Sequence, residues 1–332
     1  DTDSVFLRSY IAGAAQGTQI IHRDYHDYKG YLYMICQEGA STIQILDISA
    51  LPDSVSLVYD SDSVFSQAHN IYIDTARDMM YAGYVKELYP PNDFGVTAYD
   101  MTNPLSPVKV YQSTTDVHDF HARNDTVYFN AANTGLEVYD FSNSSSPTFL
   151  GSLTGYNYQG YNHSGWPTED GKYYIMADEN HGFPMKVLDV QDFNNIQVKN
   201  HFSSGVDVNS IPHNQIIMGD YLFVAYYYDG FYMYNISDPE NPALSAYYDT
   251  YSSANGQSYK GAWGVFPFLG MNKILISDMQ TGLYVLDVTD TLSSNNSAMS
   301  EELRWSIYPN PCEDKLNINM PAISDTPILK IV

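Results

Sequence analysis

The stretch that decides the fold is residues 212–242, PHNQIIMGDYLFVAYYYDGFYMYNISDPENP. Turns at Gly219-Asp220 and Asp229-Gly230 separate three short apolar runs, and a Pro-rich link closes the stretch. Short apolar runs bounded by Gly, Asp and Asn are typical of antiparallel strands joined by tight turns. The stretch therefore predicts one unit of at least three consecutive antiparallel strands.

The unit recurs six times along the chain. Its opening position is occupied by Arg23, His69, His118, His163, His213 and Trp263. Successive copies are thus 46, 49, 45, 50 and 50 residues apart. A period in the forties with three or four short strands per copy is typical of a β-propeller blade. We therefore predict an all-β fold, a six-bladed β-propeller.

The sixth copy lacks the outer strand that follows the Pro-rich link in the other five. Its third strand ends at Asp287, and a polar segment follows. The amino terminus offers a spare strand, because Val5–Tyr10 has the composition of the other outer strands. We expect residues 4–10 to pair with the sixth blade and close the ring, which would remove two exposed sheet edges.

The chain divides into three segments. Residues 1–292 are the predicted propeller, 293–303 have the polar composition of a linker, and 304–332 contain short apolar runs of a different pattern. The last segment has fewer than 30 residues, too few for a core of its own. It is predicted to be the front of a truncated domain of β-sandwich type.

Composition excludes several classes of partner. The 332 residues include 15 Lys and Arg against 39 Asp and Glu, so the net charge is −24. Such a chain repels nucleic acid and anionic membrane surfaces. No run approaches the roughly 20 apolar residues that span a bilayer, so we expect no membrane insertion. Cys36 lies in an apolar run and is predicted to be a buried structural thiol.

The tail resembles the opening of the carboxy-terminal sorting domain of the Bacteroidetes type nine secretion system. The resemblance rests on Tyr308-Pro309-Asn310-Pro311 followed by Lys315-Leu316-Asn317-Ile318, behind a polar linker. It implies export across the outer membrane and an extracellular or cell-surface location. It also implies that secretion and cell-surface anchoring machinery are partners of this segment.

Residues 1–292 resemble the choice-of-anchor B family, which is related to the LVIVD-repeat propellers. The resemblance is carried by His22-Arg23-Asp24, His69-Asn70-Ile71, His118-Asp119, His163-Ser164-Gly165-Trp166, Asp178-Glu179, His213-Asn214 and Gly261-Ala262-Trp263. It implies a fold and a location at the cell surface rather than an activity.

The repeat places one residue of each first strand around a common axis. The predicted ring and the residues that follow it are Arg23, Asp24, His69, Asn70, His118, Asp119, His163, His213, Asn214 and Trp263. Four imidazoles, His69, His118, His163 and His213, suit a divalent transition metal. The alternative is that these polar side chains bond backbone groups and water. The cofactor is therefore left open.

Paired carboxylates end the second strand of the fourth copy. Asp178 and Glu179, near His163 in the repeat, suit acid–base chemistry or a cation with oxygen ligands; the alternative is solvated turn residues. No GxSxG, HExxH, P-loop or EF-hand motif is present, so no catalytic residue is predicted.

The sequence leaves two functions open. The 31 tyrosines, many near turns, suit a recognition module that binds carbohydrate or a surface protein, although ordinary packing between blades also needs large residues. The second hypothesis is a metal-assisted extracellular hydrolase or lyase that uses the His ring with Asp178 and Glu179.

Overall fold

The computed structural model describes residues 7, 9–88, 91–269 and 273–288, and three short strands beyond them. Within these residues the regular elements are β-strands, apart from the 3₁₀ helix η1 (Phe193–Asn195). None of the described helical structure is long and apolar enough to cross a membrane. The chain forms two compact units, and each is described by itself.

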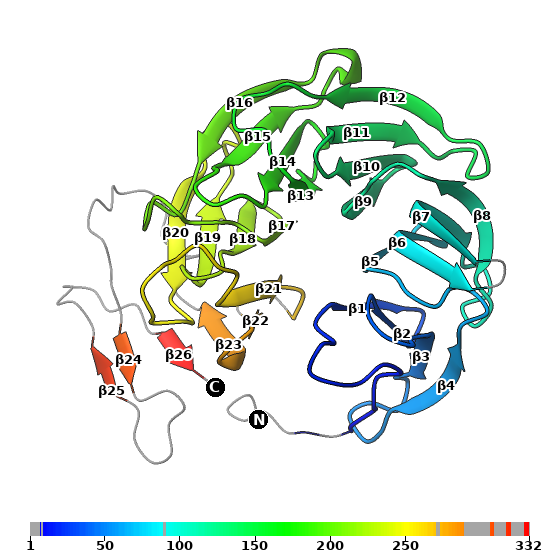
Figure 1. The fold of residues 1–332 in the computed structure, drawn as a ribbon. Coiled ribbons are helices and arrows are strands. Elements are labelled where there is room, and N and C mark those ends of the chain that lie inside the picture. Colours follow the sequence, from blue (N-terminus) through cyan, green and yellow to red (C-terminus); the bar gives the residue numbers. More distant parts are fainter. Residues whose placement is uncertain are drawn as a thin grey trace. The chain divides into compact units, whose positions relative to one another are not determined.

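The first unit comprises residues 6–179 and 186–199 and is built from four antiparallel sheets. Their strands are β1 (Arg23–Tyr28), β2 (Tyr31–Cys36), β3 (Ile43–Asp47), β4 (Ser56–Ser61); β5 (Asn70–Asp74), β6 (Met79–Leu88), β7 (Pro91–Asp100), β8 (Val108–Ser113); β9 (Asp119–Arg123), β10 (Thr126–Ala131), β11 (Gly135–Asp140), β12 (Thr148–Leu153); β13 (Asn162–Pro167), β14 (Tyr173–Asp178), β15 (Met185–Asp189) and β16 (Gln197–Phe202). The division between the units falls within β15 and β16. Strand order in each sheet follows chain order, and β1, β5, β9 and β13 lie on the inner side of the arc (Figure 1).

The second unit comprises residues 180–185 and the chain from residue 200 onwards. One sheet contains β17 (Asn214–Met218), β18 (Tyr221–Ala225), β19 (Phe231–Asn235) and β20 (Ala243–Tyr248); the other contains β21 (Ala262–Phe266), β22 (Lys273–Asp278), β23 (Gly282–Val288) and β26 (Leu329–Ile331). A separate hairpin pairs β24 (Ser306–Tyr308) with β25 (Asn317–Asn319). The structure thus contains six four-stranded sheets among the described residues, as the repeat predicts.

The register of the six copies agrees with the spacing read from the sequence. In each sheet, the residue that follows the opening position pairs with the fifth residue of the second strand. The pairs are Asp24↔Ile35, Asn70↔Gly83, Asp119↔Asn130, Ser164↔Ala177, Asn214↔Ala225 and Gly264↔Ser277. The side chain that follows the opening position therefore leaves each first strand at the same level of its sheet.

The expected closure by the amino terminus needs correction. Most of residues 4–10 lie outside the described residues, and Leu7, Ser9 and Tyr10 belong to no strand. The fourth strand of the last sheet is β26, which pairs with β23 through Leu286↔Ile331. A free sheet edge accepts any strand of suitable length, and both ends of this chain carry strand-like sequence. Whether residues 304–332 form a sorting domain stays a prediction, because most of them lie outside the described residues.

Apolar side chains of neighbouring sheets pack together in the first unit. Tyr33, Ile45, Met80 and Tyr99 are almost fully buried in one such cluster, and Tyr33 donates a hydrogen bond to the carbonyl of Pro104 (2.7 Å). Cys36 is a free, buried thiol, as predicted, and burial raises its pKa. These contacts hold the first strands at fixed positions, which is what places the candidate site.

Candidate functional site

Three repeat histidines of the first unit form a continuous row. His69 and His118 directly precede β5 and β9, and His163 lies at the bulge in β13. The ring centroids are 4.3 Å apart for His69 and His118, and 3.8 Å apart for His118 and His163. The repeat therefore brings side chains from three successive sheets into direct contact.

His22 extends this row, although the sequence pattern assigned the position to Arg23. The His22 ring lies 5.1 Å from the His69 ring. Arg23 turns away instead, and its guanidinium donates to the carbonyl of Ala15 (2.6 Å). Arg23 is in register with the other opening residues, but its long side chain reaches the amino-terminal segment. The sequence feature that could have indicated this arrangement is His22 itself, a histidine one residue before the repeat position.

Hydrogen bonds fix which ring nitrogen carries the proton in two of these histidines. Nδ1 of His69 lies 2.6 Å from the side-chain oxygen of Gln37, and Nδ1 of His118 lies 3.0 Å from the carbonyl of His163. Both partners are acceptors, so we assign the proton to Nδ1 and a lone pair to Nε2. Burial lowers the pKa of His69 to about 4, so this imidazole is neutral at physiological pH.

Two tyrosines cover the row. The hydroxyls of Tyr84 and Tyr161 are 2.8 Å apart. The Tyr84 ring meets His69 edge-on at 5.8 Å, and the Tyr161 ring meets His118 at 5.5 Å. Tyr84 lies in β6 with φ of 50°, a left-handed conformation that is costly for a bulky residue. We call His22, His69, His118, His163, Tyr84 and Tyr161 the imidazole face.

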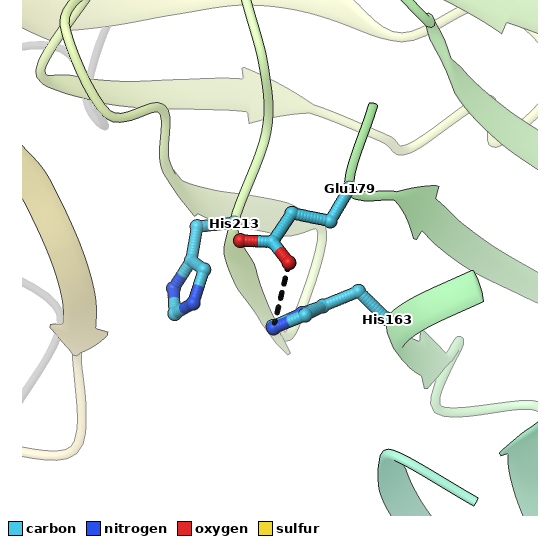
Figure 2. A group of neighbouring side chains, drawn as sticks. All are labelled: His163, Glu179 and His213. Atoms are coloured by element: carbon cyan, nitrogen blue, oxygen red, sulfur yellow. Dashed lines mark ion pairs between the residues drawn. The ribbon is translucent and has the colours of Figure 1, made fainter. Parts of the chain in front are cut away.

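Glu179 adds a carboxylate beside this face. Its Oε2 is 3.9 Å from Nε2 of His163, and the two side chains are 17% and 3% exposed (Figure 2). The backbone NH of Glu179 donates to the carbonyl of Tyr161 (2.8 Å), which fixes the carboxylate near the tyrosine. Of the predicted carboxylate pair, Glu179 is therefore the one placed to meet a ligand.

Asp178 has a structural role. Its Oδ2 accepts from the Lys186 ammonium (2.6 Å), and its Oδ1 accepts from the Tyr156 hydroxyl (2.9 Å) and the backbone NH of Gly160 (3.0 Å). The ion pair is fully buried, with both side chains 0% exposed. Burial lowers the pKa of Lys186, although the Asp178 charge opposes that effect. Asp178 thus anchors the segment that leads to Tyr161.

Asp24, Asn70 and Asp119 connect neighbouring sheets. Asp24 accepts from the backbone NH of Ile71, and the Asn70 side-chain amide donates to Asp119, both at 2.8 Å. Burial and, to a smaller extent, the nearby Asp24 carboxylate raise the pKa of Asp119 to about 7. These three predicted site residues therefore form a polar layer between the sheets.

The second unit contains the other predicted residues. Nδ1 of His213 bonds the carbonyl of Trp263, and the two rings are 4.8 Å apart. Tyr227, another left-handed tyrosine with φ of 39°, lies 4.9 Å from His213. Asn214 begins β17 and pairs with Ala225. This unit thus has its own cluster of a histidine, a tyrosine and a tryptophan.

The predicted metal site at His69, His118, His163 and His213 stays a prediction. In the described part of the first unit, no three His, Cys, Asp or Glu side chains bring ligand atoms within 4.8 Å of one another. Nδ1 of His118 is engaged by a carbonyl, and its ring packs against those of His69 and His163. His163 and Glu179 remain the pair that could contribute ligands to a metal.

Comparison with known proteins agrees with the repeat. Residues 125–154 and 215–250 match the sequence model of the LVIVD repeat. The chain carries LVIVD repeats. The first match spans β10 to β12 and the second spans β17 to β20, so each match falls on one copy of the sequence repeat. No curated protein matches the sequence.

Solved structures show the same fold at low sequence identity. The periplasmic gluconolactonase of Pseudomonas aeruginosa gives a TM-score of 0.62 at 8% identity, over 83% of this chain and 84% of its own. A protein from Bacteroides uniformis proposed to be a 6-phosphogluconolactonase gives 0.60 at 8%, over 80% and 81%. The WD40 β-propeller domain of Doa1 gives 0.53 at 10%, over 81% and 79%. The fold is an all-β, six-bladed β-propeller, with one blade for each four-stranded sheet described.

Proposed function

We propose that the protein is a recognition module that binds a neutral, polyhydroxylated ligand of carbohydrate type at the imidazole face. The observation that carries the proposal is the row of imidazoles from successive sheets, covered by the hydrogen-bonded hydroxyls of Tyr84 and Tyr161. His69 and Tyr84 are only partly buried, so the face is open to a ligand.

The chemistry of the face favours a ligand rich in hydroxyl groups. The neutral imidazole of His69, whose Nδ1 bonds Gln37, offers its Nε2 lone pair as an acceptor, and tyrosine hydroxyls both donate and accept. Aromatic rings provide rigid apolar surface for the carbon skeleton of a sugar. The net charge of −24 disfavours anionic ligands and nucleic acid. The same residue types would serve recognition of a surface protein that presents such groups.

Removing one hydroxyl tests this proposal. Tyr161→Phe keeps the ring against His118 but loses the contact with Tyr84, so we expect oligosaccharide affinity to fall about tenfold, or roughly 1.4 kcal/mol. Isothermal titration with a panel of neutral oligosaccharides measures the change. Tyr139→Phe is the control, because that hydroxyl bonds Glu137 within its own strand. Equal affinity of Tyr161→Phe and the wild type would disprove a role for the face.

We propose an extracellular or cell-surface location. The motif Tyr308-Pro309-Asn310-Pro311 and the polar linker before it support export by a type nine secretion system of the Bacteroidetes kind. The secretion and anchoring machinery would then contact the tail, and the propeller would carry the ligand site. Deletion of residues 304–332 should leave the protein inside the cell, as fractionation would show.

A metal-assisted hydrolase or lyase is the second candidate. The approach of Glu179 to Nε2 of His163 favours it, because an imidazole and a carboxylate are both ligands for a divalent metal and both act as bases. Structures with this fold include a gluconolactonase, so sugar lactones are the first substrates to screen. We expect Glu179→Gln to reduce metal content if this candidate is correct. Elemental analysis after zinc incubation that shows equal metal in both proteins would exclude it.

A further inference from the structure

A cavity of about 400 Å³ lies in the first unit, away from the imidazole face. Its walls come from β4 and the loop that follows, from the end of β6, and from β7, β8 and the link between them. Clefts of this size are typical of small-molecule sites. None of the imidazole-face residues lines the cavity.

The cavity lies where one blade departs from the repeat. β6 and β7 have 10 residues each, whereas the second and third strands of the other sheets in this unit have five or six. The extension supplies Glu87 and Leu88 to the wall. In repeat folds, insertions in a single repeat are commonly placed at the binding surface. The extension therefore builds a wall that the other blades of this unit do not have.

The polar part of the wall is ordered by hydrogen bonds. The Lys109 ammonium donates to Glu87 (2.8 Å), whose side chain is 11% exposed. The hydroxyls of Tyr59 and Ser63 are 2.9 Å apart. Tyr99 is 1% exposed, and burial together with the nearby Glu87 raises its pKa, so its hydroxyl stays protonated. The polar part of the wall thus contains both donors and acceptors.

The remaining wall is apolar. Val64, Leu105 and Pro107 line the cavity with the rings of Tyr59 and Tyr99. A ligand that fits must therefore combine an apolar face with groups that both donate and accept hydrogen bonds. Hydroxyl groups on a saturated ring meet this requirement, because each hydroxyl can bridge a carboxylate and an ammonium.

Charge selects against anionic ligands. Lys109 and Glu87 neutralise each other as an ion pair, and Asp62 repels an anion, as does the net charge of −24. We propose that this cavity is a second ligand site, specific for a neutral sugar ring. The site is independent of the proposed function, because none of the imidazole-face residues lines the cavity, although Tyr84 shares β6 with Glu87 and Leu88.

Neutral and charged sugars test the proposal directly. The probes are methyl glucoside, methyl galactoside and methyl mannoside, with glucuronate and glucosamine as charged counterparts, measured by saturation-transfer NMR and titration. We expect a neutral glycoside to bind the wild type and glucuronate to bind at least about tenfold more weakly. No binding of any neutral glycoside, or equal binding of glucuronate, would overturn the proposal.

Two substitutions locate the binding. Ser106→Trp fills the cavity and should abolish glycoside binding. Ser146→Trp is the matched control, because Ser146 occupies the same place in the next blade: the backbone NH of Ser106 bonds Asn103 and that of Ser146 bonds Asn143, both at 3.0 Å. Undiminished binding by Ser106→Trp would overturn the cavity site. If Tyr161→Phe alone removed binding, the cavity site would fall and the imidazole face would stand.

A substitution of Lys109 tests how charge selects the ligand. Lys109→Met removes the ammonium and leaves Glu87 and Asp62 to face the cavity. Glucosamine should then bind at least about tenfold more tightly than to the wild type, while neutral glycosides should bind more weakly. No change in the ratio of the two affinities would contradict the role of the ion pair in selecting a neutral ligand.

Discussion

Lys186→Met is expected to lower the unfolding free energy by about 3–5 kcal/mol, because it leaves the Asp178 carboxylate buried without its partner. Both side chains are 0% exposed and the ammonium lies 2.6 Å from Oδ2. For a domain of this size the loss corresponds to a fall in Tm of roughly 10 °C. Thermal unfolding followed by circular dichroism measures it.

The control for this prediction is a pair of the same kind in solvent. Lys172 and Asp170 are 3.0 Å apart with side chains 56% and 49% exposed, so Lys172→Met should change stability by less than about 1 kcal/mol. Adding Asp178→Asn to Lys186→Met removes the unpaired charge but keeps an oxygen for Tyr156 and Gly160. The double variant should recover most of the loss, and no recovery would contradict the electrostatic explanation.

The Lys186 pair also connects stability to the candidate site. Asp178 fixes Gly160, and Tyr161 is the next residue and contributes a hydroxyl to the imidazole face. The backbone of Glu179 is bonded to Tyr161 as well. A ligand at the face should therefore be sensitive to Lys186 even though that side chain has no exposure. Affinity measured below the Tm of Lys186→Met would show how rigidly Tyr161 must be held.

The register and the outer strands of the first five sheets could be predicted from the sequence, because a period of 45 to 50 residues fixes which residues share a level. The outer strand of the sixth sheet, β26, lies beyond the repeat and was not predicted. Asp24, Asn70 and Asp119 occupy the level predicted for them. The period does not determine the direction of a long side chain. The sequence therefore predicted Arg23 in the row of imidazoles, whereas the structure has His22 there. The contact between the His118 and His163 rings could not be predicted either, because sequence spacing gives no distance between side chains.

The remaining features of the site could not be predicted, because they depend on backbone conformation or on residues distant in the sequence. The Tyr84 ring contacts His69 from a backbone position with positive φ, and no composition rule predicts that conformation for a tyrosine. The proton position on His69 depends on Gln37, which lies 32 residues away. The role of Asp178 depends on its ion pair with Lys186, eight residues further along the chain, which no motif indicates. The cavity depends on the length of β6 and β7.

Asp119→Asn is expected to stabilise the protein at pH 8. Burial raises the pKa of this carboxyl to about 7 from an unfolded value near 3.8. The folded state therefore binds more protons between these values, and stability is lost as the pH rises from about 4 to about 7. The shift of about three units corresponds to at most about 4 kcal/mol. Asparagine has no charge to desolvate, and its oxygen can still accept from Asn70 and from the NH of Phe120.

Urea unfolding at pH 5 and pH 8 measures this difference. The gain should be largest at pH 8 and shrink toward pH 4, where the wild-type carboxyl is protonated in both states. Burial also lowers the pKa of His69 to about 4 and that of His121 to about 3, which costs stability as the pH falls below about 6.5. That loss is common to both proteins and cancels in the comparison.

Asp140→Asn separates burial from net charge. It removes the same charge from a chain of −24, but Asp140 is solvated and accepts from the NH of Ser142, which lowers its pKa. This control should gain nothing at pH 8. If both variants were stabilised equally, relief of overall repulsion would be the cause, and the Asp119 carboxylate would not be a destabilised member of the polar layer. A gain confined to Asp119→Asn would show that this layer retains a carboxylate at a cost in stability.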